Sequence, residues 1–249
     1  MAKPNGYILY EGPSMLDGAP IVVIATGFAK SSKNGKTGAL IQSWIIRSDI
    51  TPVDAANSGD DASVCGDCPH RGTVVDGKNV DRSCYVTLFQ APRAVYDAYH
   101  RGNYSKVTAA QLSKLTDGIK VRIGSYGDPA AVPLSIWKAY TKRTNGWTGY
   151  THQYRAFPEL APYCMASADS LADRAAAKLL GFRVFRVTTD LADMKKGEIV
   201  CPASKEAGHK SACDRCGLCK GATSKAKKDI VIRVHGVVGT VNAMLRRAA

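Results

Sequence analysis

The stretch CPASKEAGHKSACDRCGLC, residues 201–219, holds four of the eight cysteines in the chain. Three of them, Cys213, Cys216 and Cys219, follow one another at two-residue gaps, and Cys201 precedes them. Paired C-x-x-C units are typical of tetrahedral zinc, whereas a C-x-x-C-x-x-C run is typical of cubane iron–sulfur clusters. We therefore expect these four thiolates to bind a [4Fe-4S] cluster. The alternative is a structural zinc site with four cysteine ligands.

An earlier group of cysteines lies in a loop-like stretch that contains Gly, Asp and Pro. Cys65 and Cys68 form a C-x-x-C pair, and Cys84 follows after fifteen intervening residues. Buried structural thiols usually lie in apolar runs, so this context favours metal binding. Three thiolates on a four-iron cluster leave one iron open for a small ligand, whereas zinc would take His70 as its fourth ligand. The sequence therefore predicts one or two [4Fe-4S] clusters, with zinc as the alternative.

The composition indicates the setting of these sites. The chain has 249 residues, with 34 basic and 21 acidic side chains and a formal net charge of +13. This excess favours polyanionic partners, nucleic acid first, because neutralised phosphates release counterions. No apolar run approaches a membrane span, and the N-terminus lacks the apolar core of a signal peptide. We therefore expect a cytoplasmic protein without a membrane partner and of undecided oligomeric state, in which eight cysteines favour metal over disulfides.

The N-terminal part of the chain predicts a β-rich segment. Two short apolar runs, 21–25 and 40–46, are interpreted as strands. We separate this segment, residues 1–60, from an α/β metal-binding domain over residues 61–249.

The Gly-rich stretch between those two runs contains Gly35-Lys36-Thr37, which invites comparison with a phosphate-binding loop. The first glycine of such a loop would have to be at position 30, which is Lys30. We therefore interpret the stretch as a hairpin loop with solvated lysines. Residues 51–64, rich in Asp, Asn, Gly and Ser, are interpreted as a polar loop.

From about residue 105 the pattern alternates between helix and strand. Helices are predicted to begin at Thr108, Pro133 and Ser170, because these positions carry a capping box, a first-turn proline and a capping serine. Strands are predicted over 119–124, 147–151, 163–166, 182–187, 199–200 and 230–234. Such alternation implies parallel strands, so the predicted fold class is α/β, with a partial (βα) barrel or an open parallel sheet.

Polar and metal-binding residues follow these strands where each one ends. They are Tyr126, Gly127, Asp128, His152, Asp169, Cys201 and His235. In a parallel barrel or sheet the carboxyl ends of the strands share one face, where active sites lie. The set therefore favours an enzyme, although any single Asp or Ser in such a position can simply cap the next helix.

With these residues in view, the chain resembles the phage "gene product eighty-eight" family of uncharacterised proteins over roughly residues 60–236. The resemblance is carried by Cys84-Tyr85, Tyr126-Gly127-Asp128 with Trp137, Gly149-Tyr150-Thr151-His152, Met165-Ala166-Ser167-Ala168-Asp169, Cys201-Pro202 and Cys213-Asp214-Arg215-Cys216-Gly217-Leu218-Cys219. It implies a phage or prophage context, and hence the host cytoplasm, but no particular reaction.

A looser similarity links the chain to radical SAM enzymes, which combine a partial (βα)6 barrel with a three-cysteine cluster. The turn Gly124-Ser125-Tyr126-Gly127-Asp128-Pro129 is similar to their S-adenosylmethionine-binding turn, while the spacing C-x2-C-x15-C departs from their C-x3-C-x2-C. The similarity implies that Cys65, Cys68 and Cys84 hold the reactive cluster. It also implies that Tyr126, Gly127 and Asp128 orient S-adenosylmethionine, and that His152, Asp169 and His235 face the substrate as acid–base or binding groups.

Two functions follow as expectations. The first is a phage-type, radical SAM-like iron–sulfur enzyme that acts on nucleic acid or nucleotides. The second is a non-catalytic nucleic-acid-binding protein stabilised by zinc or a cluster. Its phosphate contacts would come from Lys220, Lys225, Lys227, Lys228 and Arg233.

Overall fold

A single large sheet forms the centre of the computed structural model, which describes residues 4–31, 34–223 and 226–248. In spatial order its ten strands are β11 (Glu198–Val200), β12 (Asp229–Arg233), β10 (Val184–Thr188), β9 (Met165–Ala168), β8 (Gly146–Thr151), β7 (Lys120–Tyr126), β3 (Ile41–Arg47), β2 (Pro20–Thr26), β1 (Gly6–Pro13) and β6 (Ser105–Lys106). A separate hairpin pairs β4 (Thr73–Val75) with β5 (Lys78–Val80).

The sheet is mostly parallel. Strand β2 runs antiparallel to both of its neighbours, β1 and β3, and the other described pairs within the large sheet are parallel. The predicted α/β class is therefore confirmed. The strand order has β11 and β6 at its two edges, so the pairing shows an open sheet and does not show a barrel.

The N-terminal strands lie where the apolar runs predict them, and they join the same sheet as the later strands. The link is the parallel pairing of β3 with β7, in which Ile41 lies opposite Val121. Ile21 to Ala25 of β2 are fully buried, as expected for a strand covered on both faces. One apolar core contains Ile45 of β3 together with residues of β7 and α5, so the strands of residues 1–60 pack as part of the larger α/β unit.

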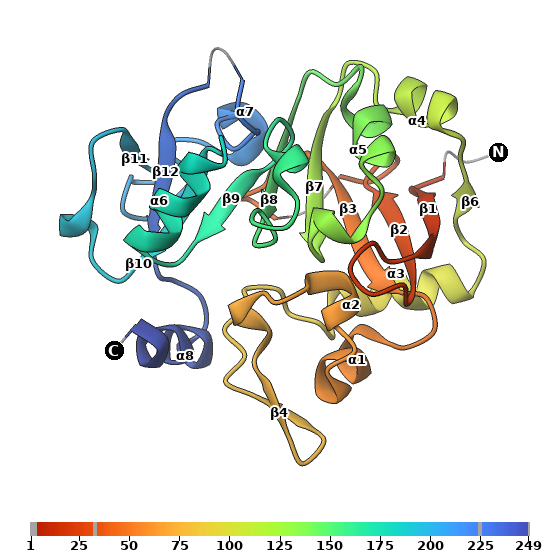
Figure 1. Cartoon of the computed structure of the whole chain (residues 1–249). Coiled ribbons are helices and arrows are strands. Elements are labelled where there is room, and N and C mark those ends of the chain that lie inside the picture. Colours follow the sequence, from red (N-terminus) through yellow and green to blue (C-terminus); the bar gives the residue numbers. More distant parts are fainter. Residues whose placement is uncertain (1–3, 32–33, 224–225, 249) are drawn as a thin grey trace.

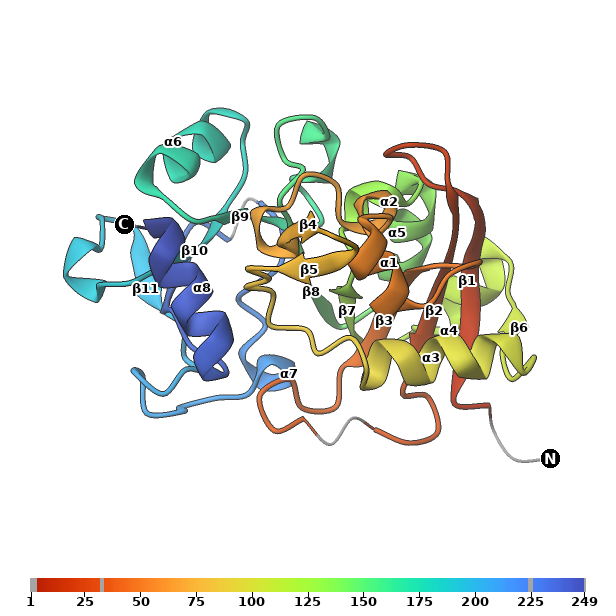
Figure 2. The same cartoon turned by 90° about the horizontal axis from the view of Figure 1, so that it is seen from below.

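Helices cover the sheet on both sides, as the view from below shows (Figure 2). One side carries α5 (Leu134–Thr141) and α6 (Leu171–Leu179), and α4 (Ala109–Leu115) packs against α5. The other side carries α3 (Ala91–His100) and the short α7 (Cys213–Cys216). The predicted starts are confirmed: Thr108 and Gln111 form a capping box, Pro133 directly precedes α5, and the Ser170 hydroxyl accepts from the Asp173 amide.

The prediction of a polar loop over 51–64 is wrong. This stretch forms α1 (Pro52–Ser58) and α2 (Ala62–Cys65). The local signals are present, because the Thr51 hydroxyl accepts from the Asp54 amide and Pro52 occupies the first turn. Helix α3 is likewise formed without having been predicted.

The remaining elements gather near the carboxyl ends of the parallel strands (Figure 1). There, α1, α2 and the β4–β5 hairpin lie beside the C-terminal helix α8 (Val238–Ala248).

The 3-10 turns are η1 (Pro69–Arg71), η2 (Pro129–Ala131), η3 (Pro158–Leu160) and η4 (Leu191–Asp193). None of the described helices is both long enough and apolar enough to cross a bilayer.

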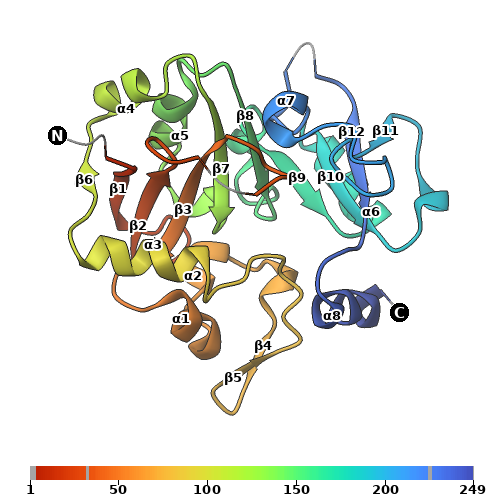
Figure 3. The same ribbon diagram turned by 180° about the vertical axis from the view of Figure 1, so that it is seen from behind.

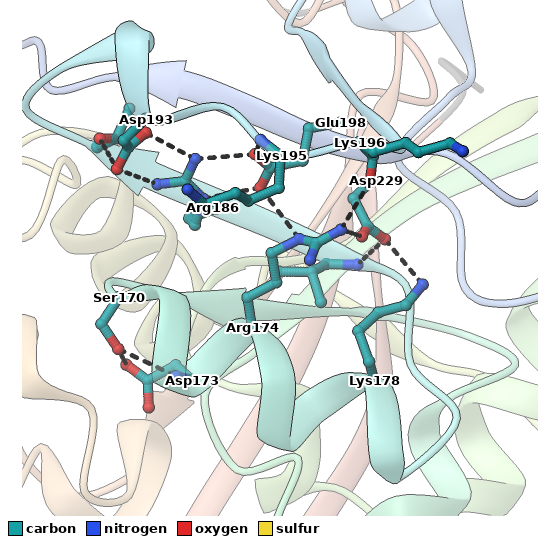
Figure 4. Close-up of polar contacts among 12 residues, drawn as sticks. Ser170, Asp173, Arg174, Lys178, Arg186, Asp193, Lys195, Lys196, Glu198 and Asp229 are labelled. Atoms are coloured by element: carbon teal, nitrogen blue, oxygen red, sulfur yellow. Dashed lines mark hydrogen bonds and ion pairs between the residues drawn. The ribbon is translucent and has the colours of Figure 1, made fainter.

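A buried ionic network fixes one edge of the sheet (Figure 4). The Arg186 side chain, 1% exposed, binds Glu198 at 2.7 Å and Asp193 at 2.9 Å. Arg174 of α6 reaches Asp229 at 2.9 Å and Glu198 at 3.2 Å. Because removing one partner of a buried pair leaves the other charge uncompensated, this network holds β10, β11 and β12 in one arrangement. Cys201 follows β11 directly, so its position depends on that edge.

Candidate functional site

One cavity of about 780 Å³ lies against the face of the sheet. Alternate residues of neighbouring strands line it: Gln42 and Trp44, Arg122 and Gly124, Thr148 and Tyr150, and Phe185 and Val187. Because residues i and i+2 of a strand share a face, this alternation assigns the cavity to one side of the sheet.

Every site residue chosen from the sequence contributes to the wall of this cavity. The set comprises Cys65, Cys68, Cys84, Tyr126, Gly127, Asp128, His152, Asp169, Cys201, Cys213, Cys216, Cys219 and His235. It includes seven of the eight cysteines, all of them free thiols. The eighth, Cys164, is fully buried in the main apolar core.

The four-cysteine group consists of Cys201, Cys213, Cys216 and Cys219. Burial raises the pKa of Cys219 to about 12, and the other three thiols add to that rise while the Tyr150 hydroxyl opposes it. Such mutual effects require thiols that lie close together. The structure thus brings together the four cysteines that the sequence groups.

Backbone hydrogen bonds hold the four-cysteine group from several parts of the chain. The Cys213 amide donates to the Lys36 carbonyl at 2.9 Å, and the Cys201 amide donates to Val231 at 2.8 Å. The Gly149 amide of β8 donates to the Cys219 carbonyl at 3.1 Å. The loop between β2 and β3 therefore crosses the face of the sheet to reach α7 (Figure 3).

Arg183 stabilises the loop that carries Cys219. Arg183 is buried, with 3% of its surface exposed. Its guanidinium donates to the Leu218 and Lys220 carbonyls at 2.7 Å each and to the Lys228 carbonyl at 2.9 Å. Helix α7 has only four residues and supplies little backbone bonding of its own. Sequence reasoning missed Arg183, because its carbonyl partners lie 35 to 45 residues further along the chain.

The three-cysteine group consists of Cys65, Cys68 and Cys84. Burial raises the pKa of Cys65 strongly, and the Cys68 and Cys84 thiols raise it further. Arg82 acts in the opposite direction on both Cys65 and Cys84. Two nitrogens of the Arg82 guanidinium, Nε and Nη2, are buried without a hydrogen-bond partner in the described structure. A cation beside these thiols favours their thiolate forms, which are the forms that bind metal.

The Tyr126-Gly127-Asp128 turn connects this group to the ends of the strands. Asp128 accepts from the Thr151 hydroxyl at 2.7 Å and from the His152 amide at 2.8 Å, and its own amide donates to Val64. Gly127 has φ +81°, and a Cβ there would lie 2.6 Å from the Cβ of Ile45. Asp128 therefore positions α2 and β8, whereas the buried hydroxyl of Tyr126 has no hydrogen-bond partner among the described residues.

His152 and Asp169, which the sequence nominated as acid–base residues, lie next to each other, together with His70. The His70 Nε2 is 3.0 Å from an Asp169 oxygen and the His152 Nε2 is 3.7 Å from the other. Burial would raise the pKa of Asp169, but the neighbouring His152 and His70 hold it well below its usual range. Burial lowers the pKa of His152, while Cys68 and Asp169 together raise it well above its ordinary value.

His235, the third nominated residue, has different partners. Its ring stacks on Tyr85 at 4.7 Å between centroids, and its Nε2 lies 2.9 Å from the Lys36 Nζ. It therefore connects the hairpin loop to Tyr85 rather than joining Asp169. The expectation that the lysines of this loop are merely solvated is wrong for Lys36, which lines the cavity.

Arg122 is a further residue that sequence reasoning missed. It projects from β7 into the cavity, 5.9 Å from the centroid of the Tyr150 ring, and its Nε is buried without a hydrogen-bond partner in the described part of the chain. Its charge lowers the pKa of Cys213, after the larger effect of burial, which raises it.

No family model matches the chain, and neither the curated proteins nor the solved structures give a match. The fold and the site therefore define the class: an α/β protein with a mostly parallel open sheet and two cysteine groups on one cavity. The resemblances to the phage family and to radical SAM enzymes stay predictions.

Proposed function

We propose that this protein is an iron–sulfur enzyme in which the cavity between two cysteine groups binds the substrate. The observation that carries the proposal is the convergence of seven thiols, in groups of four and three, on a single cavity. Buried and half-buried thiols in such numbers fit a cofactor that takes thiolates as ligands.

The spacing of the thiols favours clusters over zinc. Paired C-x-x-C units are typical of tetrahedral zinc, whereas Cys213, Cys216 and Cys219 have the C-x-x-C-x-x-C spacing that is typical of cubane clusters. Cys201 would supply the fourth thiolate.

The two groups offer different coordination. Four thiolates from Cys201, Cys213, Cys216 and Cys219 would complete the ligand set of a [4Fe-4S] cluster. Three thiolates from the other group would leave one iron open toward the cavity. Such a cluster, held by Cys65, Cys68 and Cys84, would supply an electron and an open coordination position to a cosubstrate, which in a radical SAM-like enzyme is S-adenosylmethionine.

The cavity wall suits a nucleotide or nucleic-acid substrate. Arg122 and Lys36 supply positive charge beside it. Tyr150 and Phe185 pack edge to face at 4.9 Å, and Trp44 adds a third aromatic side chain to the wall. Aromatic rings with interspersed cations bind bases by stacking and phosphates by charge.

Oxygen-free purification followed by metal and sulfide analysis tests the proposal. We expect a brown protein with about eight irons and about eight sulfides per chain, and broad absorption near roughly 400 nm. The variant C164A keeps its clusters, because Cys164 lies in the apolar core. Reductive cleavage of S-adenosylmethionine by the reduced protein then tests the enzyme class. A colourless protein with stoichiometric zinc would overturn the proposal.

A non-catalytic nucleic-acid-binding protein is the second candidate, and the net charge of +13 is the observation that favours it. Lys227, Lys228 and Arg233 are exposed and Lys220 is half-buried, while Lys225 lies outside the described residues. Zinc-containing protein that binds oligonucleotides with a steep salt dependence, and that has no redox activity, would favour this candidate.

A further inference from the structure

His70, His152 and Asp169 come from distant parts of the chain and meet at the carboxyl ends of the strands. Their ligand atoms all lie within 4.8 Å of one another. Two imidazole nitrogens and one carboxylate are a ligand set that binds iron(II) and related divalent ions in proteins. The three side chains contribute to the cavity wall, so an ion held by them would be open to the substrate.

An ion pair explains only part of this geometry. The His70 Nε2 and Asp169 lie at 3.0 Å, a normal charge-assisted contact. The His152 Nε2, however, is buried and has no hydrogen-bond partner within the described residues, since the nearest oxygen of Asp169 is 3.7 Å away. A buried nitrogen without a hydrogen bond is costly, and a metal ion that displaces the proton of this nitrogen would give it a partner.

Hydrogen bonds to the ring of His70 and to the backbone of His152 orient the two side chains, as such bonds do around metal ligands. The Nδ1 of His70 lies 2.8 Å from the Ser83 hydroxyl, and Arg247 of α8 donates to the same hydroxyl at 2.6 Å. With Nδ1 engaged, Nε2 is the atom that His70 can offer to a metal. The backbone of His152 is held by Asp128 at 2.8 Å. The 3.0 Å between His70 Nε2 and Asp169 matches adjacent ligands on one ion, given bonds of about 2.1 Å.

We propose that His70, His152 and Asp169 bind one divalent transition-metal ion of the iron(II) or manganese(II) class. This ion is distinct from the cofactors of the cysteine groups, and its remaining positions face the cavity. An oxygen of an anionic substrate is the ligand that such positions take. The site does not depend on the cluster proposal, because its donors are nitrogen and oxygen only.

Titration with Mn²⁺, followed by the loss of the free-ion EPR signal, tests the site on anaerobically purified protein freed of adventitious metal with EDTA. Mn²⁺ favours carboxylate and imidazole over thiolate, so the cysteine groups do not compete for it. We expect one ion per chain. The variants H152A and D169N weaken binding by more than about tenfold, and S83A weakens it by about tenfold because His70 loses its orienting partner. The matched controls H100Q and D190N bind as the wild type does.

Two results would overturn the site: no Mn²⁺ bound by the wild type, or equal binding by the wild type, H152A and D169N. If those variants fail to fold, diethylpyrocarbonate labelling of the wild type decides the question. Bound Mn²⁺ then protects the half-buried His70 but not the exposed His100, and absence of protection at His70 contradicts the proposal. Iron and sulfide measured in the same samples report separately on the clusters, so either proposal can fail alone.

Discussion

The two cysteine groups line the same cavity, but they differ in what surrounds them. The four-cysteine group is held mainly by backbone bonds and by Arg183, which binds carbonyls rather than thiols. Both groups have cations beside their thiols, Arg122 near Cys213 and Arg82 near Cys84, but the three-cysteine group also has the acid–base residue His152 beside Cys68. Four thiolate ligands, as in the four-cysteine group, would suit a cluster that stabilises the fold or relays electrons. Three thiolate ligands next to acid–base side chains would suit the part of the cavity where a reaction takes place.

The largest expected effect separates the groups by their iron content and thermal stability. We expect C219S to lose about four of about eight irons and to lower Tm by about 10 °C, because the described part of the 201–228 segment contains little regular structure besides α7. C84S loses about four irons too, but with a smaller fall in Tm, since Arg71 still ties its loop to buried Asp61 at 2.6 Å. C164A should retain all of the iron. Equal Tm losses in C219S and C84S would remove the proposed difference between the groups.

A smaller effect is expected at Arg183. In R183K the ammonium cannot reach the Leu218, Lys220 and Lys228 carbonyls together, so buried acceptors lose their donors. Each unpaired buried group costs roughly 1–3 kcal/mol, so we expect the free energy of unfolding to fall by about 3 kcal/mol. Urea unfolding measures this loss. A chelator should also remove iron faster from the four-cysteine group only.

The matched control for R183K is R155K, whose exposed side chain pairs with Asp173 at 2.8 Å. Surface pairs contribute little, so its stability should stay near that of the wild type. If R183K and R155K behave alike, the carbonyl contacts of Arg183 do not position the cysteine loop.

The smallest effect is a pH dependence at the sheet edge that carries Cys201. Burial would raise the pKa of Glu198, but Arg186 and the Lys195 amide hold it below its usual range. A carboxyl group with a lowered pKa adds stability above its unfolded pKa, and this stability is lost as the pH falls. We therefore expect the Tm of the wild type to fall more steeply than that of E198Q below the unfolded pKa of a glutamate, between about pH 5 and about pH 3.

E159Q serves as the control for E198Q, because Glu159 is exposed. Any acid sensitivity of bound clusters affects E159Q and E198Q equally. The difference in Tm between the two variants therefore reports the contribution of the Glu198 ion pairs. Parallel Tm curves for the wild type and E198Q would show that the edge does not depend on this carboxylate.

The sequence alone was sufficient where the signal is local or follows from strand direction. The spacing of Cys213, Cys216 and Cys219 predicts one group, because residues so close in the chain stay close in any fold. His152 and Asp169 could be paired because they end neighbouring parallel strands, β8 and β9. Capping signals at Thr108 and Ser170 located helices for the same local reason.

Other features depend on contacts that no local pattern contains. The approach of Lys36 to Cys213 and His235 spans most of the chain, so the loop between the first strands was interpreted as solvated. The pairing of β3 with β7 likewise depends on tertiary packing. His70 was considered only beside the cysteines near it in sequence, whereas the structure places it on Asp169.

The long-range contacts of both groups have a consequence for biosynthesis. Translation releases Cys65, Cys68 and Cys84 well before Asp169 and Arg247, which complete their surroundings through His70 and Ser83. The later thiols in turn need the Lys36 carbonyl from the start of the chain. Each cysteine group therefore gains its folded surroundings only once distant parts of the chain have been synthesised, and a nascent chain halted midway would expose these thiols without their partners.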